Sequence, residues 1–186
     1  YAYAIATNMY GPYDRFDPSV GHVVPSLIAK FLTASASGGE VEVWGDGSPT
    51  RDFLYSVDAA RAILLLLQSG SGCYNLASGK TYTIKELVAI LEGIFPNVRV
   101  TWNATKPNGQ RERSYNINRI RSLGFNPQYG LSEGICRTVE WCRRESSLFS
   151  SRSRQVFVAA SSKSPDLVQA ICFWNRAGCW STSGRT

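Results

Sequence analysis

The apolar positions along residues 1–145 follow two spacing patterns, one typical of helices and one typical of strands. Between residues 23 and 34 they recur three and four residues apart, with Pro25 in the first turn where proline is tolerated, which predicts a helix. Further helices are predicted at 58–67, from 83 to about 95, near 118 and at 132–141, and strands at 1–7, 40–44, 52–55, 74–76 and 98–102. Because predicted strands and helices alternate, the sequence favours an α/β fold.

Turn and cap residues indicate where these elements begin and end. Thr83 and Glu86 have the spacing of a capping box at the start of a helix. Residues 8–21 are rich in Gly, Pro and Asp, which predicts a long surface loop. Residues 1–7 are predicted to be a buried strand, and the turn at 45–50 is compatible with a hairpin between the strands on either side.

The net charge of +6 is concentrated near the end of the sequence. Residues 146–186 contain five basic residues and one acidic residue, which leaves a net charge of only +2 for residues 1–145. The nearly neutral body argues against nucleic-acid binding by the folded part. Residues 146–186 also contain ten serines and little periodicity, and we interpret them as a Ser/Arg-rich tail that is disordered or foreign to the domain.

The cysteines and the apolar runs indicate a cytoplasmic protein. The five cysteines form no CxxC pair, and with a single histidine the sequence lacks a zinc-binding set. An odd, scattered set of cysteines is more typical of reduced thiols than of a disulfide framework. The longest dense apolar run, residues 62–67, is too short to cross a bilayer. We therefore expect no bound metal and no membrane insertion.

A polar sequence, Thr7-Asn8-Met9-Tyr10-Gly11-Pro12, directly follows the first predicted strand. Ligands of open α/β sheets bind at the carboxyl ends of the strands, so small polar residues here are well placed to line a cofactor or sugar pocket. An ordinary turn with a buried aromatic ring is the alternative interpretation.

His22 is the only histidine in the sequence, so any imidazole acid–base chemistry in this chain depends on it. Ser26 and Lys30 follow four and eight residues later, on roughly the same helix face, so that an imidazole and a cation can contact one ligand. The alternative is a helix-entry residue whose side chain bonds to the backbone.

Two further segments combine cations with turn residues. Trp44 and Arg51 bracket a Gly-rich turn and supply an aromatic surface and a guanidinium fork, the two groups that a nucleoside diphosphate needs. The segment from Lys106 to Arg113 places three cations in one predicted loop, which suits phosphate but also suits a solvated basic loop. Neither a Gly-rich dinucleotide fingerprint nor a P-loop nor a G-x-S-x-G elbow occurs. The residues alone therefore indicate an α/β domain for a phosphorylated sugar or a nucleotide.

The order of the motifs is more specific than any one of them. Together they resemble the extended short-chain dehydrogenase/reductase family of nucleotide-sugar enzymes, also described as NAD-dependent epimerases and dehydratases. The resemblance covers about residues 1–144, and residues 16–25 and 44–53 are most similar to the GDP-L-fucose synthase group. The matching motifs are Asn8-Met9-Tyr10-Gly11-Pro12, Phe16-Asp17-Pro18, His22-Val23-Val24-Pro25, Trp44-Gly45-Asp46-Gly47, Arg51-Asp52-Phe53, Tyr74-Asn75-Leu76-Ala77-Ser78-Gly79, Lys106-Pro107-Asn108-Gly109-Gln110 and Leu123-Gly124-Phe125.

This resemblance implies a reaction and a role for each site residue. The GDP-L-fucose synthase group are epimerase-reductases that act on GDP-4-keto-6-deoxymannose with NADPH; another 4-epimerase or dehydratase of the family and a non-catalytic sugar-nucleotide-binding module are the alternatives. His22 is expected to be the catalytic acid and to approach the cofactor. The remaining expected contacts are Ala6, Thr7, Asn8 and Met9 with NADP(H), and Lys30, Trp44, Arg51, Lys106 and Arg113 with the GDP-sugar.

The resemblance also implies that residues 1–145 are the C-terminal, substrate-binding part of an extended Rossmann-type fold. The dinucleotide fingerprint, the Tyr-x-x-x-Lys pair and the catalytic cysteine of the family would precede Tyr1, so we expect this chain alone to be inactive. Ala6 replaces the usual proline, and Lys30 replaces the usual arginine, which keeps the charge but loses the bidentate fork. A homodimer of the full-length enzyme is compatible with the family.

Overall fold

The computed structural model describes residues 1–145, so the predicted tail at 146–186 lies outside the described residues. The described part alternates strands and helices, which confirms the α/β fold. The strands are β1 (Ala2–Ala6), β2 (Asn8–Tyr10), β3 (Glu40–Trp44), β4 (Thr50–Tyr55), β5 (Gly72–Leu76), β6 (Thr81–Thr83), β7 (Arg99–Asn103) and β8 (Glu112–Arg113). The helices are α1 (Val23–Ser37), α2 (Ser56–Ser69), α3 (Ile84–Ile94), α4 (Asn118–Arg121) and α5 (Leu131–Arg144).

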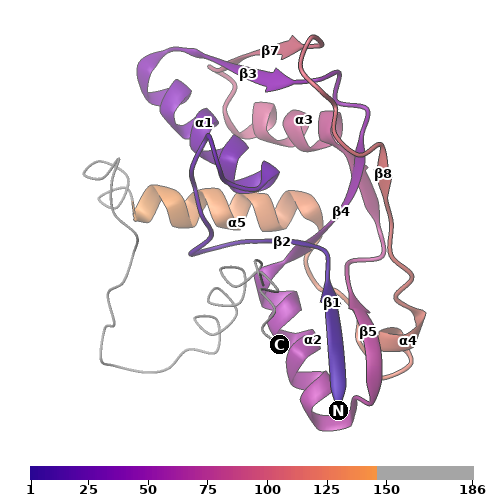
Figure 1. Cartoon of the computed structure of the whole chain (residues 1–186). Helices are drawn as coiled ribbons and strands as arrows, with labels where there is room; N and C mark the ends of the chain where they lie inside the picture. Colours follow the sequence, from indigo (N-terminus) through magenta and orange to yellow (C-terminus); the bar gives the residue numbers. More distant parts are fainter. Residues whose placement is uncertain (146–186) are drawn as a thin grey trace, which may run out of the picture.

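The strand β4 connects the two ends of the molecule. It pairs in parallel with β2 and β8 and antiparallel with β6, whereas β1 pairs in parallel with β5 and β3 pairs in parallel with β7. Figure 1 shows α1, α3, α5, β3 and β7 at one end of β4, and α2, α4, β1 and β5 at the other. The peptide between β1 and β2 therefore lies where the two ends meet.

Each end of the molecule has its own hydrophobic core. In the larger core, α1 packs on α3 through Ile28, Phe31, Leu87 and Leu91, none of which has any exposed surface, and the Phe31 and Phe95 rings lie 5.8 Å apart. Burying a side chain of this kind contributes about 1.5–3 kcal/mol. This packing fixes the helix α1, which begins directly after His22. The smaller core is formed by Leu54, Ala59, Ala62, Leu66, Tyr74, Leu76, Ala77, Ile117, Ile120 and Phe125.

The predicted capping box at the start of α3 is confirmed. The Thr83 hydroxyl accepts the backbone N–H of Glu86 at 3.0 Å, and the Glu86 carboxylate accepts the backbone N–H of Thr83 at 2.7 Å. The Thr83 hydroxyl also donates to this carboxylate at 2.8 Å, and the two bonds that the carboxylate accepts lower the pKa of Glu86. Two backbone donors that the helix leaves free are thus paired.

Replacing Thr83 with alanine is expected to destabilise the chain by about 1 kcal/mol, because the cap acceptor is lost. Thermal unfolding followed by circular dichroism measures this loss as a lower Tm. The Thr83→Ser variant keeps the hydroxyl and is the matched control. Equal Tm values for the alanine and serine variants would contradict a capping role.

The strand pairing differs from the sequence-based expectations in three ways. Residues 8–10 form β2 instead of belonging to a loop, because they pair with 53–55 of β4. β3 and β4 are not a hairpin, since they lie in different sheets and β3 pairs with β7. The basic segment that follows Lys106 contains the short strand β8, and the short strand β6 precedes α3; neither was predicted. Each error concerns pairing with residues that are distant in sequence.

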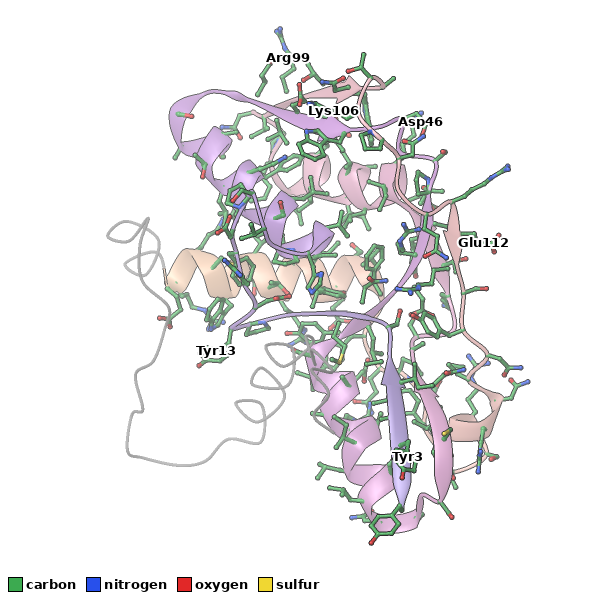
Figure 2. All side chains as sticks on the ribbon, in the orientation of Figure 1. Tyr3, Tyr13, Asp46, Arg99, Lys106 and Glu112 are labelled. Carbon is green, nitrogen blue, oxygen red and sulfur yellow. The ribbon has the colours of Figure 1, made fainter. Side chains whose placement is uncertain are left out.

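The first strand is not buried as predicted. Tyr3 and Ile5 are 62% and 53% exposed, and Figure 2 shows Tyr3 on β1 at the surface. Successive side chains of a strand face opposite sides, and here Ala4 and Ala6 pack on the smaller core while Tyr3 and Ile5 face away from it. Within the described residues β1 is paired along one edge only, by β5.

The apolar helix α2 is a surface helix of the smaller core. Ala59 and Ala62 are fully buried, whereas Leu67 is 77% exposed. In the described part of the chain, no helix combines the length and the apolar character that crossing a membrane requires.

Candidate functional site

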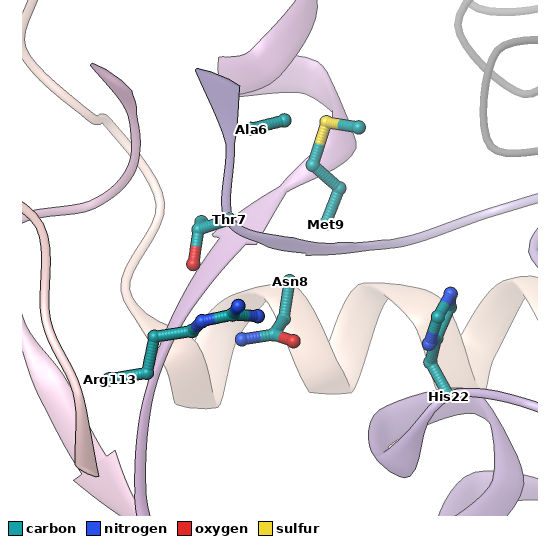
Figure 3. Close-up of a pocket in the computed structure, with 6 residues that line it drawn as sticks. All are labelled: Ala6, Thr7, Asn8, Met9, His22 and Arg113. Carbon is teal, nitrogen blue, oxygen red and sulfur yellow. The ribbon is translucent and has the colours of Figure 1, made fainter. Parts of the chain in front are cut away.

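A pocket lies where β1 ends and β2 begins. Its volume is about 180 Å³, below the roughly 300–1,000 Å³ of typical small-molecule pockets, so it fits one part of a larger ligand. Figure 3 shows the Arg113 guanidinium facing the Asn8 amide, with His22 beyond it directly before α1. All five predicted cofactor contacts line this pocket, together with one predicted substrate contact: Ala6, Thr7, Asn8, Met9, His22 and Arg113.

The backbone carbonyl of Asp52 fixes the wall formed by Thr7 and Asn8. The Thr7 hydroxyl donates to this carbonyl at 2.8 Å, and the Asn8 amide nitrogen donates to it at 3.1 Å. Both side chains therefore have one orientation, which leaves the Asn8 amide oxygen available to a ligand.

The side chain of Asp52 connects this wall to a neighbouring turn. Its carboxylate oxygens accept the backbone N–H groups of Ser78 and Gly79, each at 2.8 Å. Burial raises the pKa of Asp52, and the hydrogen bonds from Ser78 and Gly79 oppose that shift. Asp52 was not among the residues with a predicted role. The available signal was an acidic residue within a strand whose other central residues, 53–55, are apolar.

His22 is the residue before α1 and has extended backbone geometry. Its carbonyl accepts the backbone N–H of Ser26 at 2.9 Å, but within residues 1–145 its imidazole makes no capping bond to the helix. The alternative of a side chain bonded to the helix backbone is therefore wrong, and the exposed ring lies at the pocket. The Ser26 hydroxyl instead donates to the Pro18 carbonyl at 3.0 Å, so it does not share a ligand with His22.

A partly buried carboxylate lies close enough to His22 to interact with it. Burial raises the pKa of Asp14, while the Arg15 backbone N–H and the charge of His22 oppose that shift. One Asp14 carboxylate oxygen accepts the Arg15 N–H at 2.7 Å, and the other is buried without a hydrogen-bond partner in residues 1–145. Asp14 is therefore a carboxylate that lies beside His22 at the entrance to α1.

A second cluster, which we call the platform, consists of Trp44, Lys30 and Lys106. The Trp44 side chain is 58% exposed at the end of β3, and the amines of Lys30 and Lys106 lie 6.0 Å and 5.5 Å from its ring centroid. Cations at this distance are attracted to an indole face by cation–π interaction. Lys30 is two helical turns after His22, about 12 Å along α1. The platform and the pocket thus lie along one side of the same helix.

Close packing of two loops holds Lys106 near the indole. The Asn108 side chain accepts the backbone N–H of Asp46 at 2.8 Å, and Figure 2 shows Asp46 and Lys106 in neighbouring loops beside β3 and β7. Gly45 has φ 81°, and a Cβ there would overlap Asn108. Glycine is therefore required both for the backbone conformation and for the close approach.

Arg51 lies between the pocket and the platform. It is half-buried on β4, directly opposite Arg113 of β8, and Arg113 lines the pocket. A guanidinium nitrogen of Arg51 lies 3.8 Å from the ideal Cβ position of Gly109, in the loop that also carries Lys106. Arg51 is therefore next to the pocket residue Arg113 and close to the loop that carries Lys106 of the platform.

The chain is similar in sequence to proteins of one known family. The sequence profile of the NAD dependent epimerase/dehydratase family matches residues 1–77. The chain is 39% identical over 142 residues to the probable GDP-L-fucose synthase 1 of Oryza sativa, covering 74% of this chain and 43% of the rice protein. It is 32% identical over 154 residues to the GDP-L-fucose synthase of Escherichia coli, covering 76% of this chain and 48% of that protein. The chain belongs to the NAD dependent epimerase/dehydratase family.

The crystal structure of a GDP-L-fucose synthetase from Naegleria fowleri bound to NADP extends the likeness to the fold. It superposes on this family member with a TM-score of 0.72 at 28% identity, covering 77% of this chain and 47% of that one. The chain spans less than half the length of the relatives that it matches. The family therefore has an extended Rossmann-type fold, of which residues 1–145 form a part.

Proposed function

We propose that this chain forms the sugar-nucleotide-binding part of an NADP(H)-dependent epimerase-reductase that converts GDP-4-keto-6-deoxymannose to GDP-L-fucose. The likeness to GDP-L-fucose synthases from a plant and a bacterium supports the reaction. The observation that carries the proposal is the path of cations from the platform to the pocket, which ends at His22. We also propose a cytoplasmic location, because the odd, scattered cysteines of the sequence are more typical of reduced thiols than of a disulfide framework.

The platform is suited to the nucleoside diphosphate. The Trp44 ring offers a flat surface to a base, and the Lys30 and Lys106 amines beside it offer charge to phosphate oxygens. Arg51 supplies the planar guanidinium that matches a phosphate with two N–H groups. With the diphosphate at Arg51, the sugar extends toward Arg113, Asn8 and His22.

His22 is suited to proton transfer at a sugar carbon beside the ketone. Epimerisation there requires a group that exchanges protons near neutral pH, which an imidazole does. In this structure the ring lies at the pocket and does not cap the helix α1. The imidazole delivers a proton to the carbon on the face opposite to the one that lost it.

The pocket fits the nicotinamide end of NADP(H) but not the whole cofactor. The small Ala6 side chain leaves room at the strand end, and the fixed amide of Asn8 offers a hydrogen-bonding group there. Because the sequence has no Gly-rich fingerprint, residues 1–145 supply no loop of that kind for the cofactor's diphosphate. The cofactor supplies the hydride when bound, and Thr7, Asn8 and Met9 would border it.

Replacing Lys106 with methionine is expected to weaken GDP binding by about 2- to 5-fold, because one cation at the platform is lost. Isothermal titration calorimetry of the 186-residue chain with GDP measures this change. Lys80→Met is the control, because Lys80 is an exposed lysine in a turn outside the platform. Unchanged affinity in the Lys106 variant, or no GDP binding by the unsubstituted chain, would overturn the proposal.

A further inference from the structure

The carboxylate of Glu42 connects the components of the platform. Glu42 is an exposed residue of β3 and lies on the same face as Trp44, two positions later. One carboxylate oxygen accepts the indole N–H of Trp44 at 3.1 Å, and the other accepts the side-chain amide of Asn103 at 3.1 Å. The backbone carbonyl of Glu42 accepts the Lys30 amine at 3.2 Å. A single residue thus contacts the indole, the strand β7 and one of the two lysines.

The bond to the indole limits the orientation of the ring. Trp44 is exposed at a strand end, where its side chain would otherwise have access to several rotamers. Its N–H is the only hydrogen-bond donor of the side chain, so pairing it with Glu42 selects one orientation. In that orientation the Lys30 and Lys106 amines both lie within about 6 Å of the ring centroid.

The bond to Asn103 connects Glu42 to the loop that carries Lys106. The Asn103 carbonyl accepts the backbone N–H groups of Gly45 at 2.9 Å and Lys106 at 3.2 Å, and its side-chain oxygen accepts the Thr105 N–H at 3.1 Å. Glu42 therefore contacts the residue on which the turn after β3 and the loop of Lys106 converge.

We propose that Glu42 is a positioning residue, which fixes the Trp44 indole and the Lys106 loop as a preformed surface for the base of the nucleotide. This inference rests on the proposed nucleotide site. A carboxylate beside an anion site repels phosphate, so its charge alone would weaken the binding of any diphosphate. By holding the indole in place, Glu42 instead strengthens binding, and it does so only for ligands that carry a base to stack on the ring.

These opposite signs allow a direct test with Glu42→Gln. Glutamine replaces one of the two carboxylate oxygens with an NH2 donor, so in the same geometry only one of the two N–H groups still has an acceptor, and the negative charge is removed. GDP binding is expected to weaken by about 2- to 10-fold through the looser ring. Pyrophosphate, which has no base, is expected to bind as tightly as before or more tightly. Calorimetric titration of the 186-residue chain with each ligand measures both changes.

Glu40→Gln is the matched control. Glu40 is exposed on the same face of the same strand, two residues before Glu42, so its substitution removes the same charge without touching the indole. For this variant GDP and pyrophosphate affinities are expected to change in the same direction. A parallel change for the two ligands in Glu42→Gln as well would overturn the inference.

The indole N–H resonance of Trp44 in ¹⁵N-labelled chain provides a readout that needs no ligand. Trp44→Phe identifies the resonance by its loss. Glu42→Gln is expected to shift it and Glu40→Gln is not; an unmoved resonance in both variants contradicts the contact with Glu42. If the unsubstituted chain fails to bind GDP while the resonance shifts as expected, the nucleotide function is wrong and the positioning contact stands.

Discussion

Replacing Asp58 with alanine is expected to destabilise the chain by about 2–4 kcal/mol, because the substitution leaves backbone N–H groups without their acceptor. Asp58 has no exposed surface and lies in the first turn of α2. Its carboxylate accepts the backbone N–H groups of Gln128 and Tyr129 at 3.0 Å and the Arg61 guanidinium at 2.8 Å. These bonds connect α2 to the segment that leads into α5. Losing them removes support from both cores.

Urea denaturation followed by circular dichroism measures the loss in free energy of unfolding. Arg61→Ala is the control, because it removes the half-exposed partner while the two backbone bonds to Asp58 remain, and about 1 kcal/mol or less is expected. If the Asp58→Ala chain is already unfolded in buffer while Arg61→Ala stays folded, the loss in free energy of unfolding is larger for Asp58→Ala, as expected. Equal losses in the two variants would show that the backbone bonds to Asp58 contribute little.

Replacing Arg51 with methionine is expected to weaken GDP binding by about 10- to 100-fold, because hydrogen bonds between charged groups contribute more than neutral ones. Arg51 is half-buried between β6 and β8, so its guanidinium is less hydrated than a surface cation. It is also the one predicted contact that lies between the pocket and the platform. Calorimetric titration with GDP measures the effect.

Two variants distinguish a phosphate contact from a general charge effect. Arg51→Lys keeps the charge without the guanidinium fork, so an intermediate affinity is expected. Arg99→Met removes an exposed arginine at the far end of β7 and is expected to leave GDP binding nearly unchanged. If Arg51→Met and Arg99→Met weaken binding equally, Arg51 does not contact the diphosphate.

The elements that the sequence predicted well are those whose signals are local. The helix after His22 and the capping box of α3 depend on residues within a few positions of one another, and both are confirmed. The short strands β2, β6 and β8 were missed, because three residues or fewer acquire strand geometry only by pairing with the distant strand β4. The exposed face of β1 was also missed, since an apolar alternating strand has the same sequence whether or not a second layer covers it.

The site shows the same division between local and distant signals. Resemblance to a family selected residues scattered from Ala6 to Arg113, and the structure brings all of them except Arg51 to one pocket and one platform. It did not select Asp52, Glu42 or Asn108, which act on other residues of this chain. Their contacts join segments that lie between two and more than sixty positions apart, so spacing in the sequence gives no signal for them.

Nuclear magnetic resonance titration of the ¹⁵N-labelled chain with GDP and with GDP-mannose tests the central claim most directly. GDP-mannose is a stable ligand with the same nucleotide and a hexose. A sugar-nucleotide site along α1 predicts that GDP shifts the resonances of Trp44, Lys106 and Arg51. It predicts that GDP-mannose additionally shifts those of Asn8 and His22. Shifts confined to other surfaces, such as the turn at Gly38 and the start of β7 at Arg99, or identical shifts for the two ligands at the pocket, would contradict it.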